Sequence, residues 1–175
     1  MSLTTIKTNA KLFTEEPKVS IKRHKKMGLF LSSYENRLDT KGRISVPAAF
    51  RSSLINENFA GVVLYRSFTH NCIEGLSMSR MEKIANATDK MGVFDNDLDD
   101  LSALVFADAR PLLFDVTGRI VIPEELLKHA NIKDSALFVG RGNSFQIWNP
   151  DDFSKTQQAS MTNLRKARPS LKIAE

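Results

Sequence analysis

The sequence repeats one pattern of polar and apolar positions at two places along the chain. In residues 38–50, a polar Asp-x-x-Gly-Arg segment is followed by apolar residues at alternating positions, Ile44 and Val46, and then by a proline. The same order returns 76 positions later, in residues 114–126. Five of the 13 aligned residues are identical, whereas unrelated sequences of ordinary composition would share about one. The chain therefore contains two copies of one small structural unit.

Each copy predicts the same short elements in the same order. A strand leads into a turn in which a glycine, Gly42 or Gly118, can take a positive φ and an aspartate, Asp39 or Asp115, can accept backbone hydrogen bonds. A second strand leaves the turn, and a proline then begins a short helix, where its missing N–H is not needed. A further pair of strands completes each copy. The predicted strands lie near 34–38, 43–46, 112–114, 119–122, 136–139 and 145–148, and the predicted helices at 47–54 and 123–129.

These patterns divide the chain into a basic extension at 1–27, a first unit at 33–80, an acidic helical connector at 81–108, a second unit at 109–152 and a basic tail at 153–175. Ser79 and Glu82 have the spacing of a capping box, and Asn96 is placed to cap a helix with an apolar stripe. The acidic residues of the connector are expected to form a solvated face. The two ends, 1–26 and 154–175, lack apolar periodicity and are predicted to be flexible.

The composition is that of a soluble globular protein, with 42% hydrophobic and 26% charged residues. No apolar run reaches the roughly 18 residues that span a bilayer, and residues 1–26 lack the apolar core of a secretory signal. Cys72 is the only cysteine and the three histidines lie far apart, so neither a disulfide nor a metal site is expected. No arrangement of nucleophile, acid and base indicates an enzyme. We therefore expect a cytoplasmic protein with no catalytic residues, metal or cofactor.

The net charge of +5 is unevenly distributed. Residues 1–26 carry seven Lys or Arg against two Glu, and the rest of the chain is neutral overall. Contact between the folded part and a polyanion must therefore come from a local cluster of cations. Such a cluster is predicted around the first turn, and its members are Arg37, Lys41, Arg43 and Arg51. At the second turn, Thr117 stands where the first has Lys41, so the first copy is predicted to carry the larger cluster of cations.

Arg43 and Arg119 end the two turns and are candidates for contact with a polyanion. A guanidinium at an exposed hairpin tip can donate two hydrogen bonds to O6 and N7 of guanine. Asp39 and Asp115 are expected to cap the turns and orient these arginines, while the glycines supply only the backbone geometry. The sequence thus predicts two similar cationic tips, each built on the same turn.

A strand, an Asp-x-x-Gly-Arg turn, a strand, a proline-initiated helix and a second hairpin resemble the AbrB/SpoVT type of swapped-hairpin DNA-binding domain. Two such units in tandem, Leu-Asp-Thr-Lys-Gly-Arg-Ile-Ser-Val-Pro at 38–47 and Phe-Asp-Val-Thr-Gly-Arg-Ile-Val-Ile-Pro at 114–123, resemble the bacterial MraZ family. The resemblance covers about residues 28–153, including Phe-Gln-Ile-Trp at 145–148. It implies a β-rich α+β fold in which two tandem AbrB/SpoVT-like units form a pseudo-twofold, β-barrel-like core flanked by short helices.

The resemblance also implies a function. The family suggests a cytoplasmic, nucleoid-associated transcriptional regulator of the division and cell-wall gene cluster. Such a regulator is expected to assemble into a closed ring of identical subunits and to bind repeated sites upstream of its own operon. The family's DNA-contacting Asp-x-x-x-Arg element maps onto residues 39–43 and 115–119. The resemblance therefore implies that Arg43 and Arg119 bind DNA. It also implies that the first copy, with Arg37, Lys41 and Arg51, provides the main DNA-binding surface. The implied partners are double-stranded DNA and further copies of the chain, with no membrane.

Two alternatives remain at this point. An antitoxin-like protein-interaction module would share the fold and wrap a partner with its C-terminal tail, where Arg165, Lys166 and Arg168 gather. A double-psi barrel enzyme would share the pseudo-twofold architecture, but the sequence lacks its reactive groups. The family normally begins near Met27, so residues 1–26 are expected to be either an upstream extension or a basic arm that adds phosphate contacts.

Overall fold

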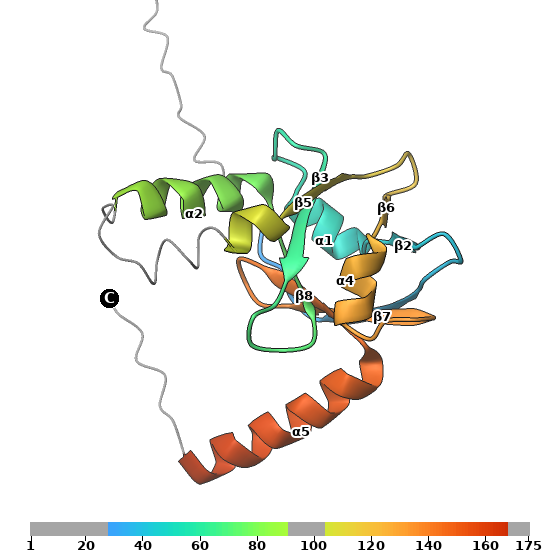
Figure 1. The fold of residues 1–175 in the computed structure, drawn as a ribbon, viewed down its shortest axis with the longest axis vertical. Coiled ribbons are helices and arrows are strands. Elements are labelled where there is room, and N and C mark those ends of the chain that lie inside the picture. The colour runs from blue at the N-terminus through green and yellow to red at the C-terminus, as the bar shows by residue number, and fades with distance from the viewer. Residues whose placement is uncertain (1–27, 91–103, 168–175) are drawn as a thin grey trace, which may run out of the picture.

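The computed structural model describes residues 28–90 and 104–167. The elements follow the predicted order in both copies (Figure 1). The first copy contains β1 (Ser33–Arg37), β2 (Arg43–Ser45), α1 (Ala48–Ser53), β3 (Gly61–Arg66), β4 (Ile73–Leu76) and α2 (Met78–Lys90). The second contains β5 (Arg110–Leu113), β6 (Arg119–Val121), α4 (Glu124–His129), β7 (Ser135–Gly140), β8 (Phe145–Trp148) and α5 (Pro150–Ala167). The predicted extension at 1–27 and the predicted helix start at Asn96 lie outside the described residues.

The strands of the two copies are interleaved. Within residues 28–90 and 104–167, the main sheet has six strands in the order β1-β7-β8-β4-β3-β5, and β2 pairs with β6 in a separate two-stranded ribbon. When each strand is exchanged for its counterpart in the other copy, the same order reads backwards, so a pseudo-twofold axis relates the two copies. β1 pairs with β7 and β3 pairs with β5, each across the copies and antiparallel. The predicted swapped-hairpin arrangement is therefore confirmed.

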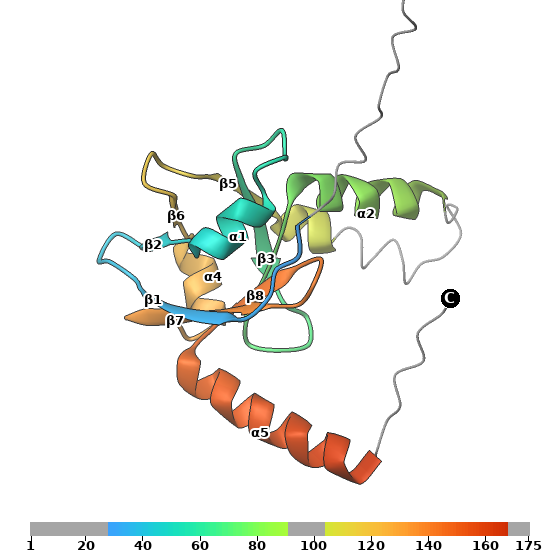
Figure 2. The ribbon, with the colours of Figure 1, turned by 180° about the vertical axis from the view of Figure 1, so that it is seen from behind.

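The described strands do not close into a barrel, which corrects the barrel-like core implied by the resemblance. β1 and β5 lie at the two ends of the six-stranded order and do not pair with each other. The β2–β6 ribbon forms a separate two-stranded sheet, and among the described residues only an isolated bridge between Leu38 and Ile44 links it to the end of β1. The architecture is an open antiparallel sheet with a ribbon and two short helices packed against it (Figure 2).

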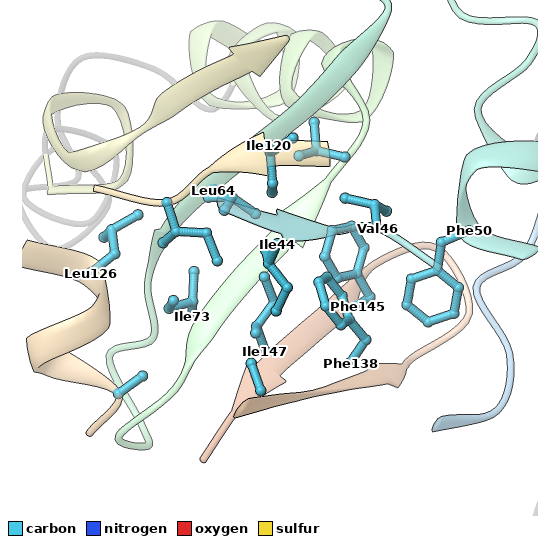
Figure 3. Close-up of a cluster of buried hydrophobic side chains, with 14 of the residues drawn as sticks. Ile44, Val46, Phe50, Leu64, Ile73, Ile120, Leu126, Phe138, Phe145 and Ile147 are labelled. Atoms are coloured by element: carbon cyan, nitrogen blue, oxygen red, sulfur yellow. The ribbon is translucent and has the colours of Figure 1, made fainter. Parts of the chain in front are cut away.

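One hydrophobic core joins both copies. Ile44 and Ile120 lie opposite each other in the ribbon and are each 1% exposed, and both side chains point into the core (Figure 3). Phe50 of α1 is fully buried, with its ring centroid 6.2 Å from that of Phe138 and 5.3 Å from that of Phe145. Edge-on and tilted aromatic pairs of this kind add to the free energy gained by burying their area. Because the core is shared, neither copy can bury its apolar side chains alone.

The connector packs on a second, smaller cluster. Met81 of α2 and Val105 of a helical segment at 104–108 cover Val63 and Leu76 of β3 and β4. α2 and this segment therefore lie against the strands of the first copy (Figure 1).

An ion pair fixes the helical segment at 104–108 to β3. The carboxylate of Asp108 accepts hydrogen bonds from the backbone N–H of Arg66 at 2.7 Å and from its Nε at 2.9 Å. Burial alone would raise the pKa of Asp108, but the Arg66 contacts outweigh it and the pKa is lowered. The connector is therefore attached to the sheet by a charged contact as well as by apolar packing.

The predicted capping box at Ser79 and Glu82 is wrong. The N–H of Arg80 donates to the hydroxyl of Ser77 at 3.2 Å, so Ser77 caps α2. The hydroxyl of Ser79 instead donates to Glu57 at 2.8 Å. The predicted capping serine thus lies two residues after the true N-cap, and its hydroxyl is used in a tertiary contact.

The C-terminal segment is helical to Ala167, which corrects the prediction of a flexible tail from residue 154. α5 begins against the sheet, where the rings of Phe153 and Trp148 lie 5.7 Å apart. The helix then extends away from the body (Figure 1), and none of its residues is buried. A helix that packs on nothing beyond its first turns needs no apolar stripe. The lack of apolar periodicity in this segment therefore did not mean that it is flexible.

Candidate nucleic-acid interface

The two Asp-x-x-Gly-Arg turns have the same geometry. In the first, Asp39 Oδ1 accepts hydrogen bonds from the backbone N–H groups of Lys41 and Arg43, both at 2.9 Å. In the second, Asp115 Oδ1 accepts from the N–H groups of Thr117 at 2.8 Å and Arg119 at 3.0 Å. The glycine of each turn is left-handed, with φ of 74° and 77°. Each aspartate therefore stabilises its turn through backbone hydrogen bonds. The glycine in the turn has a left-handed conformation that residues with a Cβ rarely adopt.

Each aspartate also orients the arginine that ends its turn. Arg43 Nε lies 2.6 Å from Asp39 Oδ2, and Arg119 Nε lies 2.8 Å from Asp115 Oδ2. The two arginine side chains are 39% and 38% exposed. Within the described residues, neither guanidinium forms another ion pair or side-chain hydrogen bond. The terminal nitrogens of both arginines are therefore available to an external acceptor.

Both arginines lie on the outer face of the β2–β6 ribbon. Arg43 is opposite Val121 and Arg119 is opposite Ser45 in the ladder, and opposite residues of an antiparallel pair share a face. The two arginines are thus diagonal neighbours. The Cβ atoms of such a pair lie somewhat less than about 7–8 Å apart. The turns beside β2 and β6 project from the same side of the molecule (Figures 1 and 2). Two guanidiniums therefore face the same region of solvent.

The backbone of each turn is hydrogen-bonded to the other copy. The carbonyl of Gly42 accepts from the N–H of Ile122 at 2.9 Å, and the carbonyl of Gly118 accepts from the N–H of Val46 at 3.1 Å. These bonds flank the β2–β6 ladder on both sides. They fix the position of the two turns relative to each other, so the spacing between the arginines is set by main-chain contacts.

The turns keep both aspartates ionised. The backbone N–H of Arg43, helped by its guanidinium, lowers the pKa of Asp39 below its usual range. The backbone N–H of Arg119, with the hydroxyl of Thr117, lowers the pKa of Asp115. Each carboxylate therefore partly neutralises its arginine, but an exposed ion pair in water is weak. The pairing orients the guanidinium without preventing contact with a phosphate or a base.

Arg51 lies at the second turn, whereas the sequence predicted it in the cluster around the first. A Cβ built on Gly118 would lie 2.6 Å from Arg51 Cζ, so the guanidinium rests on that glycine. The prediction failed because it followed distance along the chain. In a swapped topology, α1 of the first copy packs against the turn of the second.

The other predicted cations lie near the first turn. Lys41 is exposed at its tip, and Arg37 is exposed at the end of β1, opposite Ser135. A groove beside this turn is also lined by Lys128 and Lys133 of the second copy, which the sequence pattern did not indicate. Only the interleaving of the copies brings them there, so no local signal could have found them.

Other chemistry on the described part of the chain is sparse. Residues 28–90 and 104–167 contain no group of three or more His, Cys, Asp or Glu that could hold a metal ion. Cys72 is buried, and burial raises the pKa of its thiol to about 12, so the thiol is protonated at neutral pH. Among the helices of this part of the chain, none has the length and apolar character needed to cross a membrane.

Comparisons with known proteins agree with the geometry of the turns. The family model described as "MraZ protein, putative antitoxin-like" matches residues 29–102 and 105–170. The chain is 44% identical over 144 residues to the transcriptional regulator MraZ of Pelagibacter ubique (strain HTCC1062), covering 82% of this chain and 93% of that protein. It is 39% identical over 148 residues to the transcriptional regulator MraZ of Rickettsia peacockii (strain Rustic), covering 85% and 99%. It is 41% identical over 142 residues to the transcriptional regulator MraZ of Gluconobacter oxydans (strain 621H), covering 79% of this chain and 87% of that protein. With both repeats matched in order, the chain belongs to the MraZ family.

Proposed function

We propose that the chain is a sequence-specific, DNA-binding transcriptional regulator of the division and cell-wall gene cluster. It acts in the cytoplasm, associated with the nucleoid, as a ring-shaped homo-oligomer on repeated sites upstream of its own operon. The names of its relatives, each a transcriptional regulator, support the general class of this function.

The observation that carries the proposal is the pair of arginines on the outer face of the β2–β6 ribbon. A two-stranded antiparallel ribbon fits the major groove of B-DNA, which is about 12 Å wide. There Arg43 and Arg119 can donate to guanine O6 and N7, while the other cations around the turns meet phosphates. Such contacts read base edges and account for specificity in a fold whose overall charge is small.

Surfaces outside the ribbon support self-association. β1 and β5 are edge strands, and edge strands leave backbone groups that can pair with another chain. α5 exposes Met161 and Leu164, at 51% and 53%. Contacts between different surfaces of identical subunits form a ring when the rotation closes. A ring repeats one modest DNA surface several times, so repeated sites are bound with avidity.

The proposal is tested by comparing two DNA duplexes in a fluorescence anisotropy titration. One carries the sequence upstream of the protein's own gene, and the other carries the same bases in shuffled order. We expect the native duplex to bind about a thousandfold tighter or more, as specific sites do. Equal affinity for both would contradict sequence-specific binding. Light scattering on the eluting protein tests the ring, and a monomer at the working concentration would contradict it.

A second candidate is an antitoxin-like protein-interaction module. The observation that favours it is α5, which extends from the body with no buried residue and ends in the basic residues Arg165 and Lys166. Purification from the native cell tests this reading. Co-purification of a stoichiometric protein partner that is lost when residues 154–175 are deleted would support this function. Purification of the chain without any partner would count against it.

A further inference from the structure

Each turn of the ribbon is backed by a helix of the other copy, and the two backing residues differ. Arg51 of α1 rests on Gly118, and a Cβ there would lie 2.6 Å from its Cζ and 2.7 Å from its Cδ. At the first turn, a Cβ on Gly42 would meet Leu127 Cδ1 at 3.8 Å, an ordinary contact. The pseudo-twofold axis therefore places a cation at the second turn and an apolar side chain at the first.

Main-chain contacts hold Arg51 in this position. Its Nε donates to the carbonyl of Val46 at 3.2 Å, and the N–H of Val46 donates to the carbonyl of Gly118 at 3.1 Å. Arg51 is half-buried, and no ion pair within the described residues involves it. By contrast, Arg66 and Arg110 are each paired with a carboxylate. A fixed guanidinium without a counter-ion, next to an exposed turn, is suited to bind an external anion.

The position of Arg51 also adds a cation to the second turn. The first turn carries Lys41 beside Arg43, whereas the second has the neutral Thr117 beside Arg119. Arg51 supplies the missing second cation from the other copy. The second turn thus presents two cations, although its own sequence shows only one.

We propose that Arg51 is a phosphate-binding residue of the second turn, which gives this turn a second cation for contact with the DNA backbone. This inference rests on the proposed DNA-binding function. It means that the DNA site at the second tip is built from both copies, and that the first copy does not provide the main DNA surface by itself.

The test is the salt dependence of DNA binding by Arg51→Gln. Loss of one phosphate contact lowers the slope of log K against log salt concentration by about 0.9. It weakens binding about five- to tenfold at 0.1 M salt, to native and shuffled duplexes alike. Leu127→Gln, at the matching position of the other copy, is the control and is expected to leave the slope unchanged. Arg51→Lys keeps the charge and is expected to retain most of the slope.

The outcomes separate this inference from the proposed function. Failure of the unmodified protein to bind DNA would overturn the function itself. Normal binding by the unmodified protein, with the same affinity and slope in Arg51→Gln, would overturn only the role of Arg51. A fall in melting temperature and affinity in both Arg51→Gln and Arg51→Lys, with the slope unchanged, would show a purely structural role and would also overturn the inference.

Discussion

Substitution of Gly118 by alanine tests the geometry of the second turn, because two separate costs can be assigned. Gly118 has a φ of 77°, and an L-residue in the left-handed region costs about 1–2 kcal/mol. The new Cβ would also overlap the Arg51 side chain. Displacing that side chain breaks its hydrogen bond to Val46, a loss of about 1 kcal/mol. We therefore expect Gly118→Ala to destabilise the protein by about 2–3 kcal/mol.

Gly142 provides a matched control for this substitution. Its φ is 76°, but a Cβ there would meet nothing within 4 Å. Gly142→Ala should therefore show only the conformational cost of about 1–2 kcal/mol. For a domain of this size, each kcal/mol lowers the melting temperature by about 2–4 °C, so scanning calorimetry can separate the two variants.

A double-mutant comparison completes the test. When Arg51 is replaced by alanine, the overlap disappears, and Gly118→Ala should then cost no more than Gly142→Ala. An equal cost for Gly118→Ala in both backgrounds would refute the contact between Arg51 and the second turn. A neutral or stabilising Gly118→Ala, as at positions with negative φ, would refute the left-handed turn itself.

Three further predictions concern the core, the turn and the thiol. Phe50 is 0% exposed, so Phe50→Ala should lower the free energy of unfolding, measured by chemical denaturation, by about 3–5 kcal/mol. Ile55 is 80% exposed, and Ile55→Ala should leave this free energy almost unchanged. Similar losses for the two variants would contradict the packing of the core. Asp115→Asn should lower stability at neutral pH, because the pKa of Asp115 is lowered in the folded state. Its contribution is complete above the unfolded pKa near 3.8 and is lost as Asp115 protonates at lower pH, so the gap in melting temperature should narrow from pH 6 to pH 2, and a constant gap would disagree. Cys72, with its pKa raised to about 12, should react with a disulfide reagent at pH 8 only as fast as the protein opens, and an immediate reaction of the native protein would argue against its burial.

The repeated motif predicted most of the fold because it encodes local structure directly. Asp39 and Gly42 form the turn that their types indicate, and Phe145–Trp148 forms the predicted strand. The helices after Pro47 and Pro123 begin where expected. These features depend on neighbours in sequence, so a single sequence is sufficient to find them.

What the sequence could not show depends on the interleaving of the copies or on surfaces without a partner. Arg51 is eight positions beyond Arg43, yet it rests on Gly118 because α1 crosses to the other turn. Lys128 and Lys133 reach the first turn by the same exchange. α5 lacks an apolar stripe because none of its residues is buried. Contacts of this kind are set by topology, and the local pattern carries no signal for them.

The central claim, that the paired arginines of the ribbon read DNA sequence, is tested most directly by measuring native and shuffled duplexes against Arg43→Ala, Arg119→Ala and the double variant. A good Arg–guanine pair contributes about 1–3 kcal/mol of discrimination, so each single variant should lose about five- to 150-fold in preference for the native duplex. The double variant should lose that preference almost entirely while keeping its size in solution and a weak, salt-sensitive affinity for any DNA. A double variant that still prefers the native duplex as strongly as the unmodified protein would contradict the account.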